Sequence, residues 1–105
     1  MSKENKSFRA RCYRVLSQVP EGKVTTYREI AAALHSRASR AVGSAMAKNE
    51  RLIEIPCHRV VRSDGTIGQY ALGPEKKAEL LLKEGVQVKN GKVLNFRMHL
   101  HRFSI

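Results

Sequence analysis

The sequence predicts a single, mainly α-helical domain with a small β element, arranged as a winged-helix-like helix-turn-helix. Apolar residues recur at helical spacing in four segments, and a tight turn joins the middle two. Short β-branched segments lie between and after these helices. The 105 residues suit one compact domain, and a hydrophobic content of 42% can fill a modest core.

The first expected helix follows a polar leader at residues 1–6, which we expect to be flexible. Ser7 can accept a hydrogen bond as its N-cap, and Pro20 and Gly22 end the segment. Its apolar stripe consists of Phe8, Cys12, Val15, Leu16 and Val19. This spacing predicts that one face packs on the rest of the domain.

The helix pair begins at a capping box, in which Glu29 follows Thr26 by three residues. Helices are predicted over residues 27–34 and 37–47, with a turn at residues 35–36. The residues of the second helix that we expect to face inward are Ala38, Ala41, Val42, Ala45 and Met46. Two short helices joined tightly in basic sequence are typical of a helix-turn-helix, although any small helical bundle contains such pairs.

The second half of the chain has a different pattern. Residues 52–61 are apolar and β-branched around Pro56, which predicts an irregular buried segment that ends in a short strand. A helix is expected over residues 74–84, beginning at a proline and ending before Gly85. Its expected buried residues are Ala78, Leu81 and Leu82. The Asn-Gly pair at 90–91 predicts a hairpin, whereas the pattern does not place the tail at residues 97–105.

The charge is strongly positive and unevenly distributed. The chain has 20 Lys and Arg against 9 Asp and Glu, a net charge of +11. Residues 1–62 hold 13 basic and 5 acidic residues, and nine of the eleven arginines lie there. Such an excess on a small surface indicates a polyanionic partner, nucleic acid first and an anionic membrane second. The alternative is a basic surface without a partner.

The two cysteines belong to different environments. Cys12 lies on the apolar stripe of the first helix, where packing is its expected role. Cys57 precedes His58 and has arginines on both sides, a setting in which a base and nearby cations can activate a thiol. Adjacent residues of an extended strand point to opposite faces, so contact between the two side chains is not assured. From these residues alone, a buried Cys beside a surface His is an equal alternative.

The surroundings of Cys57 settle this choice. The segment IPCHRVV at residues 55–61 resembles the active-site motif of the O6-alkylguanine-DNA alkyltransferases. Further motifs match that family in order: GKVTTY at 22–27, SRAVG at 39–43, KN at 48–49, GQY at 68–70 and KEG at 83–85. The resemblance extends over residues 8–93. It implies a protein that binds duplex DNA in the minor groove, flips an alkylated guanine into a pocket and takes the alkyl group irreversibly.

The resemblance also implies the catalytic roles. Cys57 would accept the alkyl group from O6, His58 would act on the thiol through a water, and Glu84 would polarise His58. Asn49 would join the recognition helix to the active-site turn. Tyr27 would help to rotate the phosphate beside the target and would donate toward the guanine. Plain structural roles are the alternatives: Tyr27 as cover for the core edge, Asn49 as a helix C-cap and Glu84 as a partner for a lysine.

The DNA contacts follow from the same resemblance. Arg40 would be the finger that fills the gap in the base stack, with a solvated charge as its alternative. The expected DNA-binding residues are Tyr27, Arg40, Ala41, Gly43, Ser44 and Lys48. The expected base pocket consists of Val60, Tyr70 and Ala71. The small residues on the second helix suit a close approach to DNA without strong sequence preference, because major-groove reading requires long polar side chains.

Three departures from the family pattern affect the expectations. We expect this segment to work without the N-terminal domain found in larger members, which is the first departure. Ala71 stands where many relatives have Ser or Arg, and it offers no side-chain donor to O6. Leu72 stands where relatives often have Gly or Trp, which can change the alkyl groups that fit. A short branch of the family lacks the acceptor cysteine, whereas this chain retains Cys57.

The resulting expectation is a DNA repair protein that works as a monomer without cofactor or metal. Its expected partner is double-stranded DNA that contains O6-alkylguanine, with O4-alkylthymine as a further substrate. Neither a membrane span nor a secretion signal is visible, which predicts a cytoplasmic or nuclear protein. The main alternative is a protein that binds the lesion and flags it without transfer. A sequence-specific regulator and a Cys–His hydrolase are weaker alternatives.

Overall fold

The computed structural model describes residues 7–103, so the predicted flexible leader at residues 1–6 lies outside the described part. The helices are α1 (Phe8–Leu16), α2 (Tyr27–Ala33), α3 (Ser39–Ala47), the 3-10 helix η2 (Cys57–Arg59), α4 (Pro74–Lys83) and α5 (Phe96–His99). The strands are β1 (Thr25–Thr26), β2 (Val60–Val61), β3 (Val88–Lys89) and β4 (Lys92–Val93). The predicted mainly helical fold with small sheets is confirmed. Among the described helices, none has the length and apolarity needed to cross a membrane.

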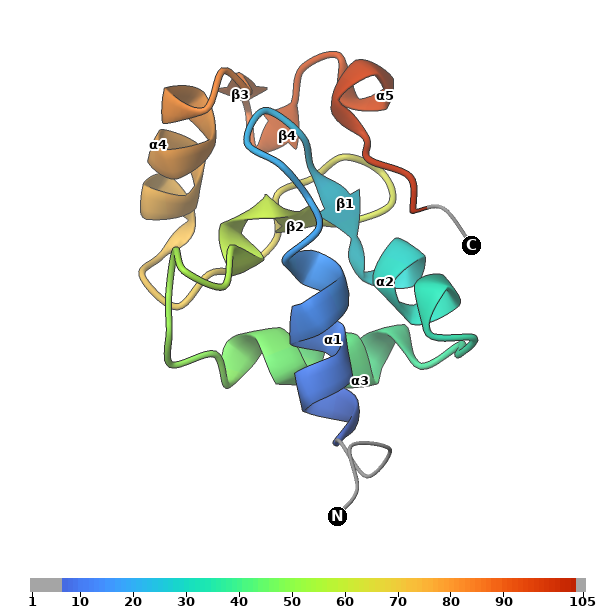
Figure 1. Ribbon diagram of the computed structural model, residues 1–105. Coiled ribbons are helices and arrows are strands. Elements are labelled where there is room, and N and C mark those ends of the chain that lie inside the picture. Colours follow the sequence, from blue (N-terminus) through green and yellow to red (C-terminus); the bar gives the residue numbers. More distant parts are fainter. Residues whose placement is uncertain (1–6, 104–105) are drawn as a thin grey trace.

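Helices α1, α2 and α3 pack together on one side of the molecule (Figure 1). The Ser7 side chain accepts from Ala10 N at 3.1 Å, as the predicted cap of α1. Tyr13 Oη donates to Ala45 O at 2.6 Å and thereby joins α1 to α3. The core between these helices includes Cys12, which is fully buried as predicted.

The predicted helix-turn-helix is present as α2 and α3. Thr26 Oγ1 accepts from Glu29 N at 3.0 Å, so the expected N-cap forms. Helix α3 begins two residues later than predicted, because His35 adopts a left-handed φ of 57° and Ser36 Oγ accepts from Ala38 N. These contacts hold the chain in a turn up to Ala38.

The buried face of α3 is narrower than predicted. Val42, Ala45 and Met46 are buried. Ala38 and Ala41 are exposed, so the prediction that they face inward is wrong. Ala38 precedes the helix as its N-cap residue, and Ala41 lies about 100° around the axis from Val42, on the side away from α1 and α2.

Strands β1 and β2 pair in parallel and join two packed regions. Thr25 pairs with Val60, and Thr26 pairs with Val61. Val60 belongs to the core of α1, α2 and α3, whereas Val61 belongs to a second core on the other side of the strands. That second core is formed by Val24, Val61, Ile67, Leu81, Val86 and Val93. The short parallel pair therefore fixes the helix-turn-helix relative to the other half of the domain.

Helix α4 buries a different face from the predicted one. Leu80 and Leu81 are buried together with Lys77, whereas Leu82 is 58% exposed, so the predicted burial of Leu82 is wrong. Leu82 lies about 100° around the helix from Leu81, which points it away from the core. Gly85 follows the helix with φ 90° and permits the reversal of the chain.

The predicted hairpin forms, with β3 and β4 paired in antiparallel register. Asn90 and Gly91 have φ values of 53° and 77°, the left-handed pair that a tight hairpin turn requires. Strand β4 ends at Val93, and Phe96 begins α5. The tail after α5 runs along β1, where Leu100 bridges Val24 in parallel. Sequence patterning did not place this segment.

The burial of α4 predicts unequal effects of two adjacent substitutions. Leu81→Ala removes a fully buried side chain and should lower the free energy of unfolding by about 2–5 kcal/mol. Leu82→Ala is the matched control and should change it by less than about 1 kcal/mol, because Leu82 is mostly solvated. Urea denaturation measures both values. Equal losses would contradict the orientation of α4.

Candidate active site

A cavity of about 340 Å³ lies between α3, the start of α2 and the loop before α4. It is lined by Tyr27, Gly43, Met46, Ala47, Cys57, Arg62, Gln69, Tyr70 and Ala71. Aromatic, small apolar and polar side chains therefore converge on one sulfur atom. This composition suits a flat heterocycle, because an apolar slot with a few directed polar groups is typical of small-ligand sites.

Cys57 is held at the back of this cavity by local backbone structure. It is the first residue of η2, and its N–H donates to Ile55 O at 2.7 Å. Pro56 precedes it in a conformation that turns the chain out of the extended form. Cys57 and His58 both lie in this 3-10 turn, and β2 follows directly, so the predicted irregular segment that ends in a short strand is confirmed. The Cys57 residue is 6% exposed.

Asn49 connects the end of α3 to the cysteine. Its Nδ2 donates to Cys57 Sγ at 3.3 Å and to Ile55 O at 2.9 Å. Its Oδ1 accepts from Arg51 N at 2.9 Å. The buried Asn49 side chain therefore has hydrogen-bond partners for both its amide nitrogen and its amide oxygen. A residue that only capped the helix C-terminus would not need these contacts. The amide N–H also presents a donor that favours negative charge on the sulfur.

Glu84 joins the two residues after Cys57. Its Oε2 lies 2.9 Å from His58 Nε2 and 2.7 Å from Arg59 Nη2, and its Oε1 accepts from Arg59 Nε at 2.9 Å. Arg59 Nη1 also donates to Val19 O at 2.7 Å, at the end of the α1 segment. The alternative of a surface partner for a lysine is therefore excluded for Glu84.

This network determines the state of the imidazole. Burial lowers the pKa of His58, although the hydrogen bond and charge of Glu84 act in the opposite direction. Burial acts to raise the pKa of Glu84, but the hydrogen bonds from Arg59 and His58 outweigh it and leave the pKa below its usual value. An ionised Glu84 can only accept, so Nε2 carries the proton of a neutral His58. Nδ1 is then the basic nitrogen, and it is buried without a partner in residues 7–103.

Two tyrosines give the cavity hydroxyl groups that stay protonated at neutral pH. Burial raises the pKa of Tyr27 and of Tyr70. Tyr27 Oη lies beside Gly68 and Arg62, since a Cβ at Gly68 would be 3.6 Å from that oxygen and 3.5 Å from Arg62 Nε. Tyr70 meets His58 edge to face with ring centroids 6.4 Å apart, and its buried Oη has no partner within the described residues.

Lys77 is a functional candidate that sequence reasoning missed. It is fully buried on α4, and its Nζ donates to the carbonyl oxygens of Ile67 and Gln69, the latter at 3.0 Å. It therefore fixes the loop that carries Tyr70 into the cavity. Burial lowers its pKa to about 8. Lys77 lies one helical turn before Leu80 and Leu81 on the apolar stripe, and this spacing could have indicated that it is buried.

The structure brings most of the predicted site together but not all of it. Val60 is fully buried in the core and is not part of the cavity lining. Ala71 lines the cavity, and Leu72 beside it is 54% exposed. Sequence reasoning also missed Met46, Ala47 and Gln69 as lining residues. The arginines near Cys57 divide: Arg62 lines the cavity, whereas Arg51 pairs with Glu54 on the surface.

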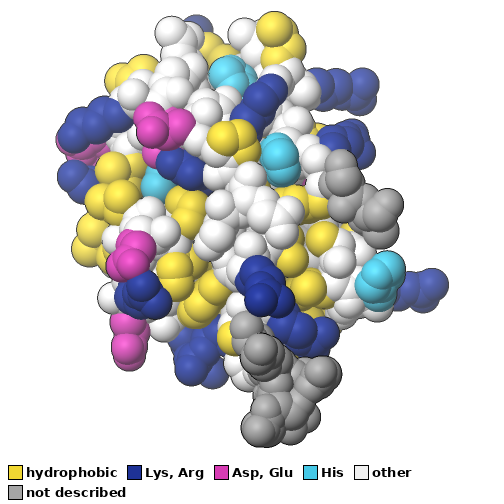
Figure 2. Space-filling model, in the orientation of Figure 1, with side chains coloured by type: hydrophobic (Ala, Val, Ile, Leu, Met, Phe, Trp, Pro, Cys, Tyr) yellow, Lys and Arg dark blue, Asp and Glu magenta, His cyan; other side chains and the backbone are white. Residues whose placement is uncertain are grey.

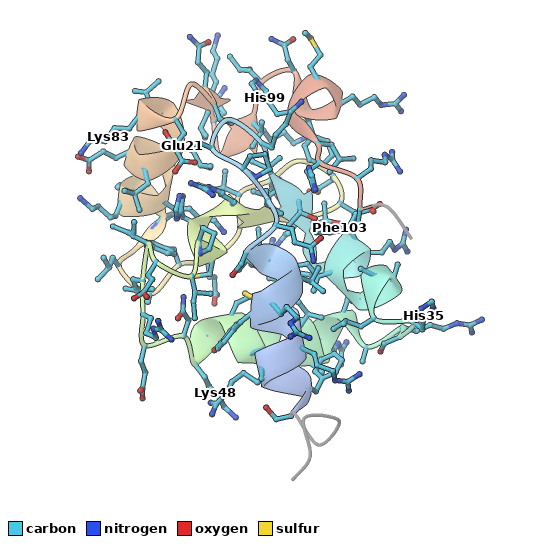
Figure 3. All side chains as sticks on the ribbon, viewed as in Figure 1. Glu21, His35, Lys48, Lys83, His99 and Phe103 are labelled. Atoms are coloured by element: carbon cyan, nitrogen blue, oxygen red, sulfur yellow. The ribbon has the colours of Figure 1, made fainter. Side chains whose placement is uncertain are left out.

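The outer face of α3 carries small and basic residues next to the cavity. The exposed residues of this face are Arg40, Ala41, Ser44, Ala47 and Lys48. Gly43 opens into the cavity, and a Cβ there would meet nothing within 4 Å. Lys48 projects from the end of the helix in Figure 3. Within residues 7–103, no group of three His, Cys, Asp or Glu side chains could hold a metal ion.

Known proteins are similar to this chain in sequence and in fold. The family described as 6-O-methylguanine DNA methyltransferase, DNA binding domain, matches residues 7–86. The methylated-DNA–protein-cysteine methyltransferase of Candida glabrata is 45% identical over 87 residues, which are 82% of this chain and 42% of the relative. That of Metallosphaera sedula is 47% identical over 83 residues, 79% of this chain and 52% of the relative. The chain spans about half the length of these two curated relatives.

Solved structures extend the similarity. S. pombe Atl1, in complex with damaged DNA containing O6-carboxymethylguanine, matches with a TM-score of 0.81 and 30% identity over 98% of this chain and 100% of that one. Mycobacterium tuberculosis OGT in complex with DNA matches with a TM-score of 0.73 and 34% identity, over 77% and 50% of the two chains. This chain belongs to the 6-O-methylguanine DNA methyltransferase DNA-binding domain family.

The buried Lys77 predicts a pH-dependent contribution to stability. The folded-state pKa of about 8 lies below the usual 10.5, so the unfolded chain binds more protons between these values. The difference in unfolding free energy between wild type and Lys77→Met should therefore be flat below pH 8. It should rise in favour of wild type above pH 8, by up to about 1.4 kcal/mol per pH unit.

Urea denaturation at several pH values between 7 and 10 measures this dependence. Lys76→Met is the matched control, because the neighbouring Lys76 is partly solvated and pairs with Glu79 at 3.6 Å. Its difference from wild type should stay flat across the range. A flat difference for Lys77→Met as well would contradict the burial of the ammonium group.

Proposed function

We propose that this domain repairs DNA by transferring an alkyl group from O6 of guanine in duplex DNA to Cys57, once per molecule. The observation that carries the proposal is a cysteine in a base-sized cavity, held by Asn49 beside a His58–Glu84 pair. The curated relatives named as cysteine methyltransferases support the same reaction.

The proton of the thiol leaves by way of His58. Because Glu84 accepts from Nε2–H, the basic Nδ1 can take the Cys57 proton through one water molecule. Asn49 Nδ2 stabilises the thiolate that results. Glu84 is the positioning residue, since it fixes the ring and stabilises the imidazolium without touching the sulfur. Arg59 holds Glu84 in place from the opposite side.

The transfer step forms one bond and breaks one. Cys57 Sγ attacks the alkyl carbon and forms a thioether, while the bond from that carbon to O6 breaks. The electron pair stays on the guanine, which regains a proton to become the normal base. Tyr27 and Tyr70 remain protonated and can donate to the departing base. The thioether on Cys57 is stable in water at neutral pH and does not release the alkyl group, so each protein molecule reacts once.

The α3 face would bind the DNA. Its small residues permit a close approach to the minor groove, and its basic residues meet the phosphates. Arg40 would enter the base stack as the guanine leaves it, which offsets part of the few kcal/mol that flipping costs. Gly43 and Ala47 of the same helix line the cavity together with Cys57. A base that flips out of DNA whose minor groove is bound to α3 would therefore enter the cavity next to Cys57.

A second candidate function is recognition of the lesion without transfer. The similarity to Atl1 over the full length of both chains favours it, because Atl1 in that complex binds DNA containing O6-carboxymethylguanine. The presence of Cys57 in the cavity favours transfer. The two functions give different products, and one experiment distinguishes them.

Intact mass after mixing with an O6-methylguanine duplex tests the proposal. The protein should gain the mass of one methyl group, and peptide mapping should place it on Cys57. Cys57→Ser should gain none and should still bind the duplex. Cys12→Ser is the matched control and should react as wild type, since Cys12 is buried in the core and burial raises its pKa. Tight binding of the wild type with no mass gain would favour recognition alone.

The role of Arg40 predicts a loss that is specific to the lesion. Arg40→Ala should slow transfer about tenfold or more, because the vacated stack then lacks the guanidinium that offsets flipping. Its affinity for undamaged duplex should fall only a few-fold, as for the loss of one phosphate contact. Arg37→Ala, an exposed arginine in the turn before α3, is the matched control and should slow transfer little. Equal effects of the two variants in single-turnover assays would argue against the finger.

A further inference from the structure

A second hollow of about 400 Å³ lies beside the first, between the start of α2, the exit of β2 and the tail after β4. We call this hollow the tail groove. Its polar lining residues are Thr26, Arg28, Glu29, Ser63, Arg97 and Arg102. Two pairs of consecutive residues connect the tail groove to the active-site cavity. Tyr27 and Arg62 line the cavity, and the residues that follow them, Arg28 and Ser63, line the tail groove. The linings of the two hollows therefore meet at these two pairs of neighbouring residues.

The tail groove is positively charged. It holds three arginines and one glutamate, a net charge of +2. Glu29 Oε2 lies 3.6 Å from Arg102 Nη1, a pair in which the arginine side chain is 74% exposed. Arg28 and Arg97 have no acidic partner within the described residues. In Figure 2 the visible acidic side chains gather mainly on the side of α4, whereas the side of α2 and α5 is dominated by Lys and Arg.

The tail that supplies Arg97 and Arg102 is fixed to the fold. Val24 N donates to His99 O at 2.9 Å, and His101 N donates to Val24 O at 2.7 Å. His99 Nδ1 lies 2.9 Å from Gly22 O. Phe103 packs on the core of α1, α2 and α3, and Figure 3 shows His99 beside the turn before β1. The arginines thus project from an ordered segment, so little further ordering is needed when they bind.

We infer that the tail groove binds phosphates of the DNA strand that carries the alkylated base, so that the segment after β4 is part of the DNA-binding surface. This inference rests on the proposed function. A flipped nucleotide stays bonded to both neighbours, so its strand has to leave the cavity mouth on two sides. The lining of the tail groove begins at Arg28 and Ser63, the residues that follow Tyr27 and Arg62 of the cavity, and we take the groove as the path of the strand on one side. Guanidinium groups match phosphate oxygens in geometry and charge.

The salt dependence of binding to an undamaged duplex tests the inference. Full-length chain carrying Arg97→Gln and Arg102→Gln should show a slope of log K against log salt that is shallower than wild type by about 1.8, or about 0.9 for each phosphate contact. Lys83→Gln with Lys89→Gln makes the same charge change on exposed positions of α4 and β3, and should leave the slope nearly unchanged. Arg97→Lys with Arg102→Lys keeps both charges and should restore most of the slope.

Hydroxyl-radical footprinting on a lesion duplex gives a second measurement. Wild type should protect one side of the lesion farther than the Arg97→Gln, Arg102→Gln variant, whose footprint should shorten on that side only. Thermal unfolding followed by circular dichroism checks that the variant is folded. An unchanged slope and footprint, or equal slope losses in both double variants, would overturn the inference, and an acidic protein partner would then be the better occupant.

Failure of alkyl transfer and failure of the tail-groove inference give different experimental results. Binding to undamaged duplex needs no transfer, so the slopes report on the tail groove even if Cys57 gains no alkyl group. Conversely, transfer from the free base O6-benzylguanine should be equal in wild type and in the Arg97→Gln, Arg102→Gln variant, because that substrate has no phosphate. Slower transfer from the free base would assign the tail arginines to the shape of the cavity and overturn the inference.

Discussion

The carboxylate of Glu84 is the contact on which the rest of the site depends. It binds the imidazole of His58 and the guanidinium of Arg59 at once, and Arg59 reaches on to Val19 O. The end of α4, the η2 turn and the end of the α1 segment are therefore tied at one point. A buried histidine beside an arginine would be costly without this acceptor, because both would lose their hydration unpaired.

The same constraint explains why the site lies where two packed regions meet. The helix-turn-helix belongs to one core and α4 to the other, and β1 and β2 join them. Asn49 links α3 to Cys57 on one side, while Lys77 holds the loop before α4 on the other. A cysteine at this junction can face a groove-binding helix and still be supported by charged groups that are kept from water.

The sequence predicted the local features and missed those that depend on distant packing. The N-cap at Thr26 and the turn at Asn90 follow from short local motifs. The site residues Cys57, Asn49 and Glu84 were expected from the resemblance to the alkyltransferase family. The burial of Lys77 and the exposure of Leu82 depend on how α4 meets the strands, which no local pattern specifies. The tail was unplaced because its order comes from pairing with Val24, 76 residues before Leu100.

Removal of the thiol proton by His58 requires an imidazole whose Nδ1 carries no proton. Nitrogen-15 NMR of the labelled protein separates the two ring nitrogens, and a His58→Gln variant assigns the signals among the four histidines. We expect a neutral ring at pH 7 with the proton on Nε2 and an unprotonated Nδ1, since burial lowers the pKa of His58 and Glu84 accepts from Nε2. A ring protonated on Nδ1 at that pH, alone or together with Nε2, would contradict it, because His58 would then have no basic nitrogen for the thiol proton.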